Sequence, residues 1–508
     1  MKTKLFISLL AALMLASCTD LLELYPLDNI STGTFWKSET DFENALTSCY
    51  GRLQNDNFCQ LPYWDLMTDN AYGQHNNGSA NTIAQGNIDT NTGGFVSGVF
   101  NNSYSSIARI NIFLDKLKDF DGMSATKKTQ YEAEAKMLRA FFYSYLYFCY
   151  GDVPVVDEPL TLENQYVAKS PAAEVLSFLM SDLDFAIQNL QNVTYKESGG
   201  RWTVNAAKAY KARVLMYDAY DSGGNAIASK MQEARTLLDQ VTGYRLADDY
   251  SDNFQDLKQE DCPEIIFSIK FLAPNNYSGS DMYYADWVCA SPLANLISLY
   301  DMADGSPGTP VPYSGRGVID YAVFSNASLD EREPRAWKSF FINEYRIGGN
   351  SYIPSNNRPI GTGLAKFLSP NLTPPFSYSA YSQQDWVILR YADVMLLQAE
   401  IENELNGASQ TVYENINAIR LRAGTSALPA GLSKEEMRER IRRERRVEMC
   451  FEGQRYFDLK RWKIAKEVLN AVVDGLITYR FEDRHYLWPL PQTEIDKANG
   501  VLVQNPDY

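Results

Sequence analysis

The chain has 508 residues, of which 45% are hydrophobic and 13% aromatic, and this composition is typical of a globular protein with a large core rather than of a disordered one. Its formal net charge of −16 argues against a nucleic-acid ligand, because binding to phosphates requires clustered lysine and arginine. The only histidines are His75 and His485, and no His/Cys cluster has metal-ligand spacing. We therefore expect no metal, no cofactor and no histidine-based catalysis.

The first 18 residues, MKTKLFISLLAALMLASC, have the form of a bacterial lipoprotein signal. Lys2 and Lys4 precede an apolar segment that is too short to span a bilayer, and LASC has the lipobox pattern of an apolar residue, two small residues and a cysteine. We predict a signal peptide over residues 1–17 and lipid attachment to Cys18, which would anchor the protein to a membrane. The alternative is an ordinary signal peptide followed by an incidental cysteine.

The chain has six further cysteines, an even number that would allow all of them to pair in disulfides. Several of them lie in apolar helical contexts, which equally suit buried free thiols. We expect no disulfide-dense framework. These cysteines are Cys49, Cys59, Cys149, Cys262, Cys289 and Cys450.

The first helix is expected after Ser38, which is placed to cap FENALTSCYGRLQ. Residues 69–102 differ sharply, because eight Asn and six Gly leave few large apolar side chains for a core element. A structureless loop of this length is uncommon in a compact domain unless it is functional. Its NIDTNTG stretch resembles a calcium loop, but Gly98 stands where the last acidic ligand belongs, so we do not expect calcium there.

Helical periodicity then returns in several stretches of about 15–20 residues. The second half of residues 127–150 is nearly all apolar or aromatic, which predicts a buried central helix. Alanine-rich, tyrosine-marked helices with short connections favour antiparallel pairs of tetratricopeptide type, with a plain helical bundle as the alternative. The expected helices cover residues 103–120, 127–150, 171–190, 203–220 and 228–241.

Residues 249–384 change in character, because Gly, Pro, Asn, Ser and Tyr dominate after the β-like run CPEIIFSIKF. They predict a loop-rich insertion with short strands. Helical patterns resume at 385–406, 410–423 and 434–462, and the last segment is largely irregular.

Residues 438–462, RERIRRERRVEMCFEGQRYFDLKRW, combine dense charge with aromatic residues. At 100° per residue, Glu444 and Glu448 fall within an arc of about 80° that also holds Met437, Ile441 and Phe451. Because a buried carboxylate without a partner is costly, we predict that each pairs with an arginine. Arg390, Arg420 and Arg422 are the candidates, Gly453 is expected to cap the helix, and the alternative is an exposed, solvated helix.

Several stretches resemble, in the same order, the SusD/RagB family of outer-membrane nutrient-binding lipoproteins of Bacteroidetes. They include EAKMLRAFFYSYLYFCYGDVP at 134–154, GGRWTVNAAKAYKARVLMY at 199–217, ERRVEMCFEGQRYFDLKRW at 444–462 and YLWPLPQTEI at 486–495. The resemblance covers essentially the whole mature chain and is weakest at 56–102 and 306–384.

This resemblance implies a mostly α-helical fold, with tetratricopeptide-like helix pairs beside a loop-rich variable region that carries few short strands. The helical N-terminal region would cover residues 18–245 and the C-terminal region residues 246–508. It also implies a non-catalytic protein that captures a glycan at the cell surface. The partner would be a SusC-like TonB-dependent transporter in the outer membrane, and the protein would lie over it and face the cell exterior.

The signature stretches belong to the scaffold, so candidate ligand contacts must be chosen by their chemistry. Sugar rings present C–H faces to aromatic planes and hydroxyls to polar side chains, so a site needs exposed aromatics beside polar loop residues. Two stretches meet this requirement. In the Asn-rich loop the candidates are Asp69, Asn70, Tyr72, His75, Asn76 and Asn77, and in YSGSDMYYADW they are Tyr277, Tyr283, Tyr284 and Trp287.

Alternatives remain at several of these positions. Trp287 suits a core role as well as a ligand contact, and His75 suits a hydrogen bond within the loop. If the second stretch is a strand, at most one of Tyr283 and Tyr284 faces a ligand. For the whole protein, the alternatives to glycan capture are a glycoside hydrolase with two carboxylates, a tetratricopeptide scaffold for proteins, and a peptide-binding member of the same fold.

Overall fold

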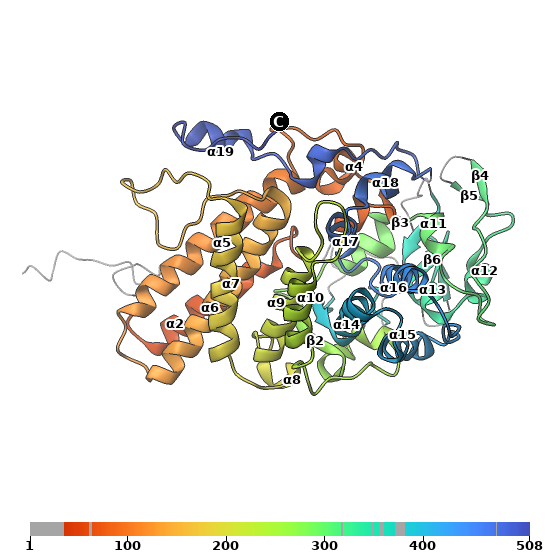
Figure 1. The fold of residues 1–508 in the computed structure, drawn as a ribbon, viewed down its shortest axis with the longest axis horizontal. Helices are drawn as coiled ribbons and strands as arrows, with labels where there is room; N and C mark the ends of the chain where they lie inside the picture. The colour runs from red at the N-terminus through yellow and green to blue at the C-terminus, as the bar shows by residue number, and fades with distance from the viewer. Residues whose placement is uncertain are drawn as a thin grey trace, which may run out of the picture.

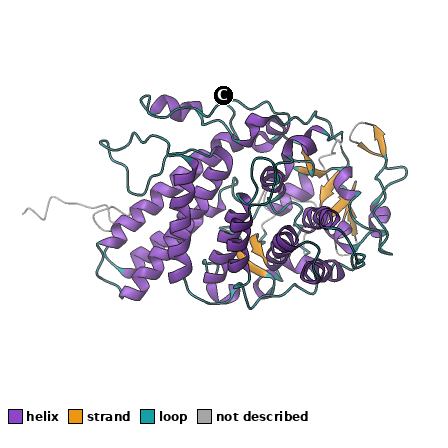
Figure 2. Ribbon diagram, viewed as in Figure 1, coloured by secondary structure: helices purple, strands orange, loops and turns teal. Residues whose placement is uncertain are grey.

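The computed structural model describes residues 35–59, 63–315, 318–347, 350–354, 360–370, 382–473 and 475–508. Within these ranges helices dominate, and the few strands are short and arranged in antiparallel pairs (Figures 1 and 2). The predicted fold class is therefore confirmed. Cys18 and the signal sequence lie outside the described residues.

The N-terminal half is built from long helices that lie side by side (Figure 1). Its first helix begins after Ser38, whose Oγ accepts a hydrogen bond from the Asp41 amide at 3.2 Å, as predicted. The longest helix, α6, is central, and its second half is buried on nearly every side, as predicted. The helices are α2 (Glu39–Tyr50), α5 (Phe95–Lys118), α6 (Ala125–Tyr150), α7 (Ala172–Asn189), α9 (Val204–Tyr217) and α10 (Ala228–Leu238).

The C-terminal half continues the array with α14 (Tyr391–Asn406), α15 (Gln410–Arg422) and α16 (Lys434–Glu448), and α14 packs against both α10 and α16. The prediction of a helix from residue 385 is wrong for its first turn. Residues Trp386–Arg390 form strand β10, which pairs antiparallel with β2 (Ile265–Ile269). Both strands are buried throughout, and periodicity cannot distinguish a fully buried strand from a buried helix.

The insertion predicted at 249–384 carries short strands, as expected, and those after β2 lie at the end of the molecule away from α5 to α7 (Figures 1 and 2). The strands beyond β2 are β3 (Ala290–Pro292), β4 (Tyr313–Gly315), β5 (Val318–Ile319), β6 (Phe340–Ile342), β7 (Tyr345–Ile347), β8 (Asn350–Tyr352) and β9 (Thr362–Leu364). Short helices α12 (Asn326–Asp330) and α13 (Pro334–Ser339) connect them.

Residues 69–102 are not the structureless loop that their composition predicts. They contain strand β1 (Ala71–Gly73), the short helix α4 (Ala80–Ala84) and the start of α5 at Phe95. Ile83 and Ile88 are buried, and Phe95 lies edge-on to Trp64 with 4.9 Å between ring centroids. The few apolar side chains of this segment are therefore sufficient to hold it against the core.

Glu444 and Glu448 are buried and paired with arginines, as predicted. Glu448 accepts from Arg390 at 2.6 Å and from Arg335 at 2.7 Å, and it also contacts Arg422. Burial alone would raise the pKa of Glu448, but the three guanidinium groups hold it well below its usual range. We call the surrounding set the buried ionic network: Glu264, Glu333, Glu444, Glu448, Glu452, Arg335, Arg390, Arg420, Arg422 and Lys366.

Helix α16 ends at Glu448, five residues before the predicted cap at Gly453. Phe451 and Gly453, with φ of 62° and 75°, instead form the turn that leads into α17 (Arg455–Arg461). Leu459 and Trp462, at the end of this stretch, are buried. All six cysteines among the described residues are buried, and none of them forms a disulfide.

Candidate ligand-binding site

The two stretches selected for ligand binding lie beside each other in space. Strand β1 pairs antiparallel with β3, with Ala71 opposite Pro292 and Gly73 opposite Ala290. Beyond the pairing, the Gln74 amide donates to the Cys289 carbonyl at 3.3 Å, and His75 Nε2 lies 3.1 Å from the Trp287 carbonyl oxygen. The loop after β1 and the segment before β3 therefore form one surface.

Three aromatic side chains and His75 lie on this surface, and we call them the aromatic patch. Tyr277 is 40% exposed, Tyr283 and Trp287 are half-buried, and His75 is exposed. Tyr283 and Trp287 meet edge to face, with ring centroids 5.7 Å apart and planes at 74°. A patch of partly exposed rings is the kind of surface on which the C–H face of a sugar can stack.

The segment that carries Tyr283 is a π-helical turn, η5 (Met282–Asp286), rather than a strand. Adjacent residues on such a turn still point in different directions, so Tyr283 reaches the surface while Tyr284 is fully buried, 5.5 Å from the ring of Phe367. Gly279 leaves room for the Tyr283 ring, because a Cβ at that position would lie 2.6 Å from it. Tyr284 therefore holds the turn from inside and does not contact a ligand, contrary to the prediction.

Asp69 and Asn70 are also buried, so their prediction as ligand contacts is wrong. Asp69 forms a two-bond ion pair with Arg455, both bonds at 2.9 Å. Burial alone would raise the pKa of Asp69, but Arg446 and Arg455 lower it to about 2. Asn70 accepts from Arg446 Nε at 2.8 Å and donates to Asp65 at 2.8 Å. These side chains fix the start of β1 to the C-terminal helices.

The remaining candidates of the Asn-rich loop mainly shape it. Tyr72 is half-buried against a small cluster that includes Leu293 and Tyr479. Asn76 adopts a left-handed conformation with φ of 50°, and its Oδ1 accepts from the Asn81 amide at 2.9 Å, near the start of α4. Asn77 donates to Cys289 Sγ at 3.4 Å. The abundance of asparagine in this segment thus serves local hydrogen bonding.

The structure adds Asp56 to the site. Burial raises the pKa of Tyr63 and of Tyr283, and the neighbouring Asp56 carboxylate raises both further. Asp56 itself reaches the surface beside these rings. Its carboxylate is a hydrogen-bond acceptor next to the patch. Its sequence context, QNDN, contains no aromatic residue or motif that marks it as a site residue.

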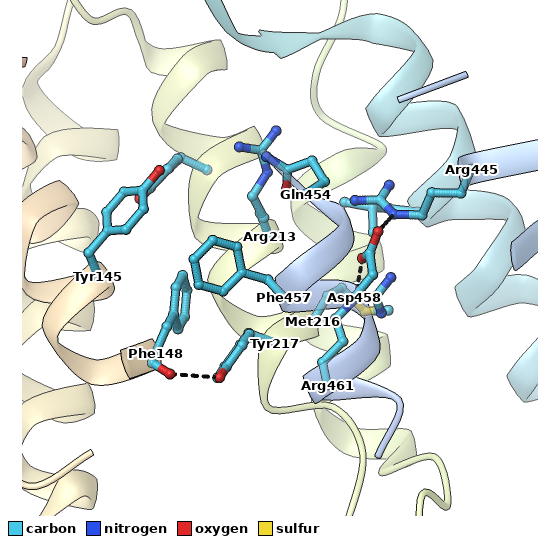
Figure 3. Close-up of a pocket in the computed structure, with 12 residues that line it drawn as sticks. Tyr145, Phe148, Arg213, Met216, Tyr217, Arg445, Gln454, Phe457, Asp458 and Arg461 are labelled. Atoms are coloured by element: carbon cyan, nitrogen blue, oxygen red, sulfur yellow. Dashed lines mark hydrogen bonds and ion pairs between the residues drawn. The ribbon is translucent and has the colours of Figure 1, made fainter. Parts of the chain in front are cut away.

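A cavity in the helical core is not a second ligand site (Figure 3). Its volume is about 30 Å³, which suits a water molecule, and it lies between α6, α9, α14, α16 and α17. Its polar lining groups are already paired: Arg445 binds Asp458 at 2.7 Å, Arg213 binds Asp393 at 2.7 Å, and the Tyr217 hydroxyl donates to the Phe148 carbonyl at 2.9 Å. The cavity therefore belongs to the packing of the helices.

The described residues contain neither a cluster of metal ligands nor a membrane-spanning helix. No group of three or more His, Cys, Asp or Glu side chains there is arranged to hold a metal ion. None of the helices in those same ranges combines the length and the hydropathy needed to cross a bilayer. His485 is buried far along the chain from the patch, and burial lowers its pKa to about 4.

Comparisons with known proteins decide the family. The profile of the SusD family matches residues 248–508, which is about half of the chain. The chain belongs to the SusD family. A second profile, described as starch-binding associating with outer membrane, matches residues 24–216.

The relatives of the chain agree with this assignment along its whole length. A SusD-like protein of Formosa agariphila is 28% identical over 524 residues, covering 96% of this chain and 95% of that protein. Two solved SusD-like proteins of Bacteroides fragilis share the fold, each with a TM-score of 0.78 and 25% identity. The first comparison covers 96% of this chain and 100% of the solved chain, and the second covers 92% and 99%. The second protein is described as carbohydrate-binding.

Proposed function

We propose that this SusD-family protein binds a glycan at the aromatic patch and does not alter it chemically. The proposal is supported mainly by the contact between two loops that are about 200 residues apart in the chain. This contact brings four side chains together on one surface: His75, Tyr277, Tyr283 and Trp287. Rings for stacking lie beside Asp56 as a hydrogen-bond acceptor. A solved relative described as carbohydrate-binding supports the same class of ligand.

The protein acts at the outer membrane, to which the lipid on Cys18 anchors it, and faces the cell exterior. It delivers the glycan to a SusC-like TonB-dependent transporter. The lipobox and the family profile described as associating with outer membrane support this location. Replacing Cys18 by Ser is expected to release the protein from the membrane fraction, and detergent extraction of the native protein is expected to co-purify a large β-barrel. A native protein found in the soluble fraction would contradict the lipid anchor. Extraction of the native protein without a β-barrel would contradict the transporter partner.

The binding site is tested by affinity electrophoresis in gels that contain starch, laminarin, xylan, mannan or levan. At least one polymer is expected to retard the wild type, and Tyr277→Ala combined with Trp287→Ala should weaken that retardation by about tenfold or more, because two stacking surfaces are lost. Tyr166→Ala is the matched control, since Tyr166 is 48% exposed on a different loop. Unchanged retardation of the double variant would reject the patch.

The same samples distinguish the alternatives. No new reducing ends should appear when the protein is incubated with the retarding polymer, whereas their release would identify a glycoside hydrolase. If no polymer retards the wild type and a peptide library binds instead, the ligand is a peptide. Tyr284 is left intact in these variants, because its buried ring would confuse loss of binding with loss of folding.

A further inference from the structure

A hollow opens beside the small buried cluster that also supports the aromatic patch. Its volume is about 370 Å³, which is within the range of small-molecule sites. Helix α13 and the loop before β2 contribute Trp337 and Gln255, and α12 and β7 contribute Asp330 and Arg346. We call it the Trp337 hollow.

Trp337 is an unusual residue for the outer face of its helix. Arg335 and Ala336 are fully buried, whereas the Trp337 side chain is 44% exposed at the hollow. The short helix is held rigidly from below, because Arg335 donates to Glu448 at 2.7 Å and to Glu333 at 2.7 Å. The helix therefore has a fixed position, and its indole is partly exposed at the hollow with the Lys338 ammonium 5.4 Å from the ring centroid. A partly exposed ring on a fixed helix is suited to stacking on a ligand.

The polar groups around the indole indicate a neutral ligand. Arg346 and Asp330 form an ion pair at 2.8 Å, and Lys338 pairs with Asp249 at 2.6 Å, so the charges of the hollow cancel. Among the described residues the side-chain amide of Gln255 has no hydrogen-bond partner, and it offers both a donor and an acceptor. An anionic ligand would find no unpaired cation here, whereas sugar hydroxyls can both donate and accept.

The hollow and the aromatic patch share one support. Ala285 and Val288, on either side of Trp287's position in the chain, pack against Phe341 and Tyr345 in a small buried cluster. Phe341 and Tyr345 also line the Trp337 hollow. The two aromatic surfaces are thus connected through one buried cluster.

We propose that the Trp337 hollow is a second carbohydrate subsite that binds a neutral sugar by stacking on Trp337 and by hydrogen bonds to Gln255, Asp330 and Arg346. This inference rests on glycan binding as the function of the protein but not on the aromatic patch being a site. Two subsites on one protein raise the apparent affinity for a polymer, because a chain held at one subsite has a high effective concentration at the other.

The test compares Trp337→Ala with the Tyr277/Trp287 double variant, and uses short oligosaccharides of whichever panel polymer retards the wild type. Calorimetry is expected to give two sites in the wild type, one in each variant and none when all three substitutions are combined. In gels, Trp337→Ala should weaken retardation by about tenfold. Trp337→Phe, which retains a ring, should restore most of the binding, and an unchanged thermal midpoint for Trp337→Ala shows that the fold is intact.

The possible failures are distinguishable. If Trp337→Ala binds like the wild type while the double variant loses binding, the second subsite is rejected and the aromatic patch stands. If Trp337→Ala abolishes binding and the double variant has no effect, the hollow is the sole glycan site and the patch is rejected. If none of the five polymers retards the wild type, both proposals are rejected.

Discussion

Glu448 in the buried ionic network and Trp287 in the aromatic patch lie in regions that hold their side chains in different ways. Glu448 is fully buried between three arginines that come from α13, β10 and α15. Trp287 is half-buried on a loop, next to a π-helical turn and a histidine from a distant part of the chain. Dense charge therefore marks the rigid scaffold of this protein, and the surface suited to a ligand is sparsely charged and aromatic.

This contrast follows from the energetics of burial. A charge inside the protein must have its partners in place, so the network is fully specified by the fold. A ligand site needs groups whose hydrogen bonds and faces remain available until the ligand arrives. Asp69 shows the distinction within one segment: it lies only six residues before His75, but its carboxylate is committed to Arg455.

The largest expected effect comes from breaking the network. Glu448→Ala leaves Arg335, Arg390 and Arg422 without their shared acceptor, and we expect it to lower the free energy of unfolding by about 3–5 kcal/mol. Urea denaturation followed by circular dichroism measures this loss. Glu439→Ala is the matched control on the same helix, since the Glu439 side chain is 72% exposed, and it should change stability by about 0.5 kcal/mol or less. Equal losses in the two variants would show that the network does not stabilise the fold.

Much of the scaffold was predictable because its pattern is local. The helical phase of α16 places Glu444 and Glu448 on the apolar face, and the cap at Ser38 and the apolar second half of α6 are equally visible in the sequence. Arg335 was missed as a partner of Glu448 because it lies 113 residues away on a six-residue helix inside the irregular insertion.

From the sequence, the candidate site could be predicted only as two separate stretches of the chain, the Asn-rich loop and residues 277–287. Composition selected both of them, but not their contact, which depends on the pairing of β1 with β3. Composition also does not distinguish the exposed candidate residues of these stretches from the buried ones. Asp69 meets Arg455 across 386 residues, and whether Tyr283 or Tyr284 points outward depends on a π-helical turn that has no sequence signature.

A smaller effect is expected from Asp281, a buried carboxyl directly before the turn that carries Tyr283. Burial and, to a smaller extent, the nearby Asp256 raise the pKa of Asp281 to about 7, although the hydrogen bond that it accepts from the Ser369 amide at 2.8 Å opposes this rise. Between the unfolded value near 4 and about 7 the folded state binds more protons than the unfolded state. Stability should therefore fall as the pH rises through this window, by at most about 1.4 kcal/mol per pH unit.

Asp281→Asn keeps an acceptor for the Ser369 amide but cannot ionise, so it should flatten the dependence of unfolding free energy on pH between 4 and 7. Burial also raises the pKa values of Asp65 and Glu333 to about 6, so these carboxyls contribute to the slope in both proteins, and the difference in slope between the wild type and Asp281→Asn isolates the contribution of Asp281. If glycan affinity also becomes less dependent on pH in Asp281→Asn, the turn beneath the patch is coupled to this proton. The same slope in the wild type and the variant would mean that Asp281 is ionised throughout the window.

The smallest expected effect distinguishes the two roles of His75. Its Nε2 lies 3.1 Å from the Trp287 carbonyl oxygen, so it is placed to position the loop that carries the indole. Losing one such hydrogen bond costs about 0.5–1.5 kcal/mol, so His75→Ala should weaken glycan binding by roughly two- to tenfold. A double-mutant cycle with Trp287→Ala separates positioning from direct contact. If His75 acts by positioning the indole, its removal has little further effect once the indole is gone. If His75 contacts the glycan itself, the same loss appears in both backgrounds, and the patch then uses a polar contact as well as stacking.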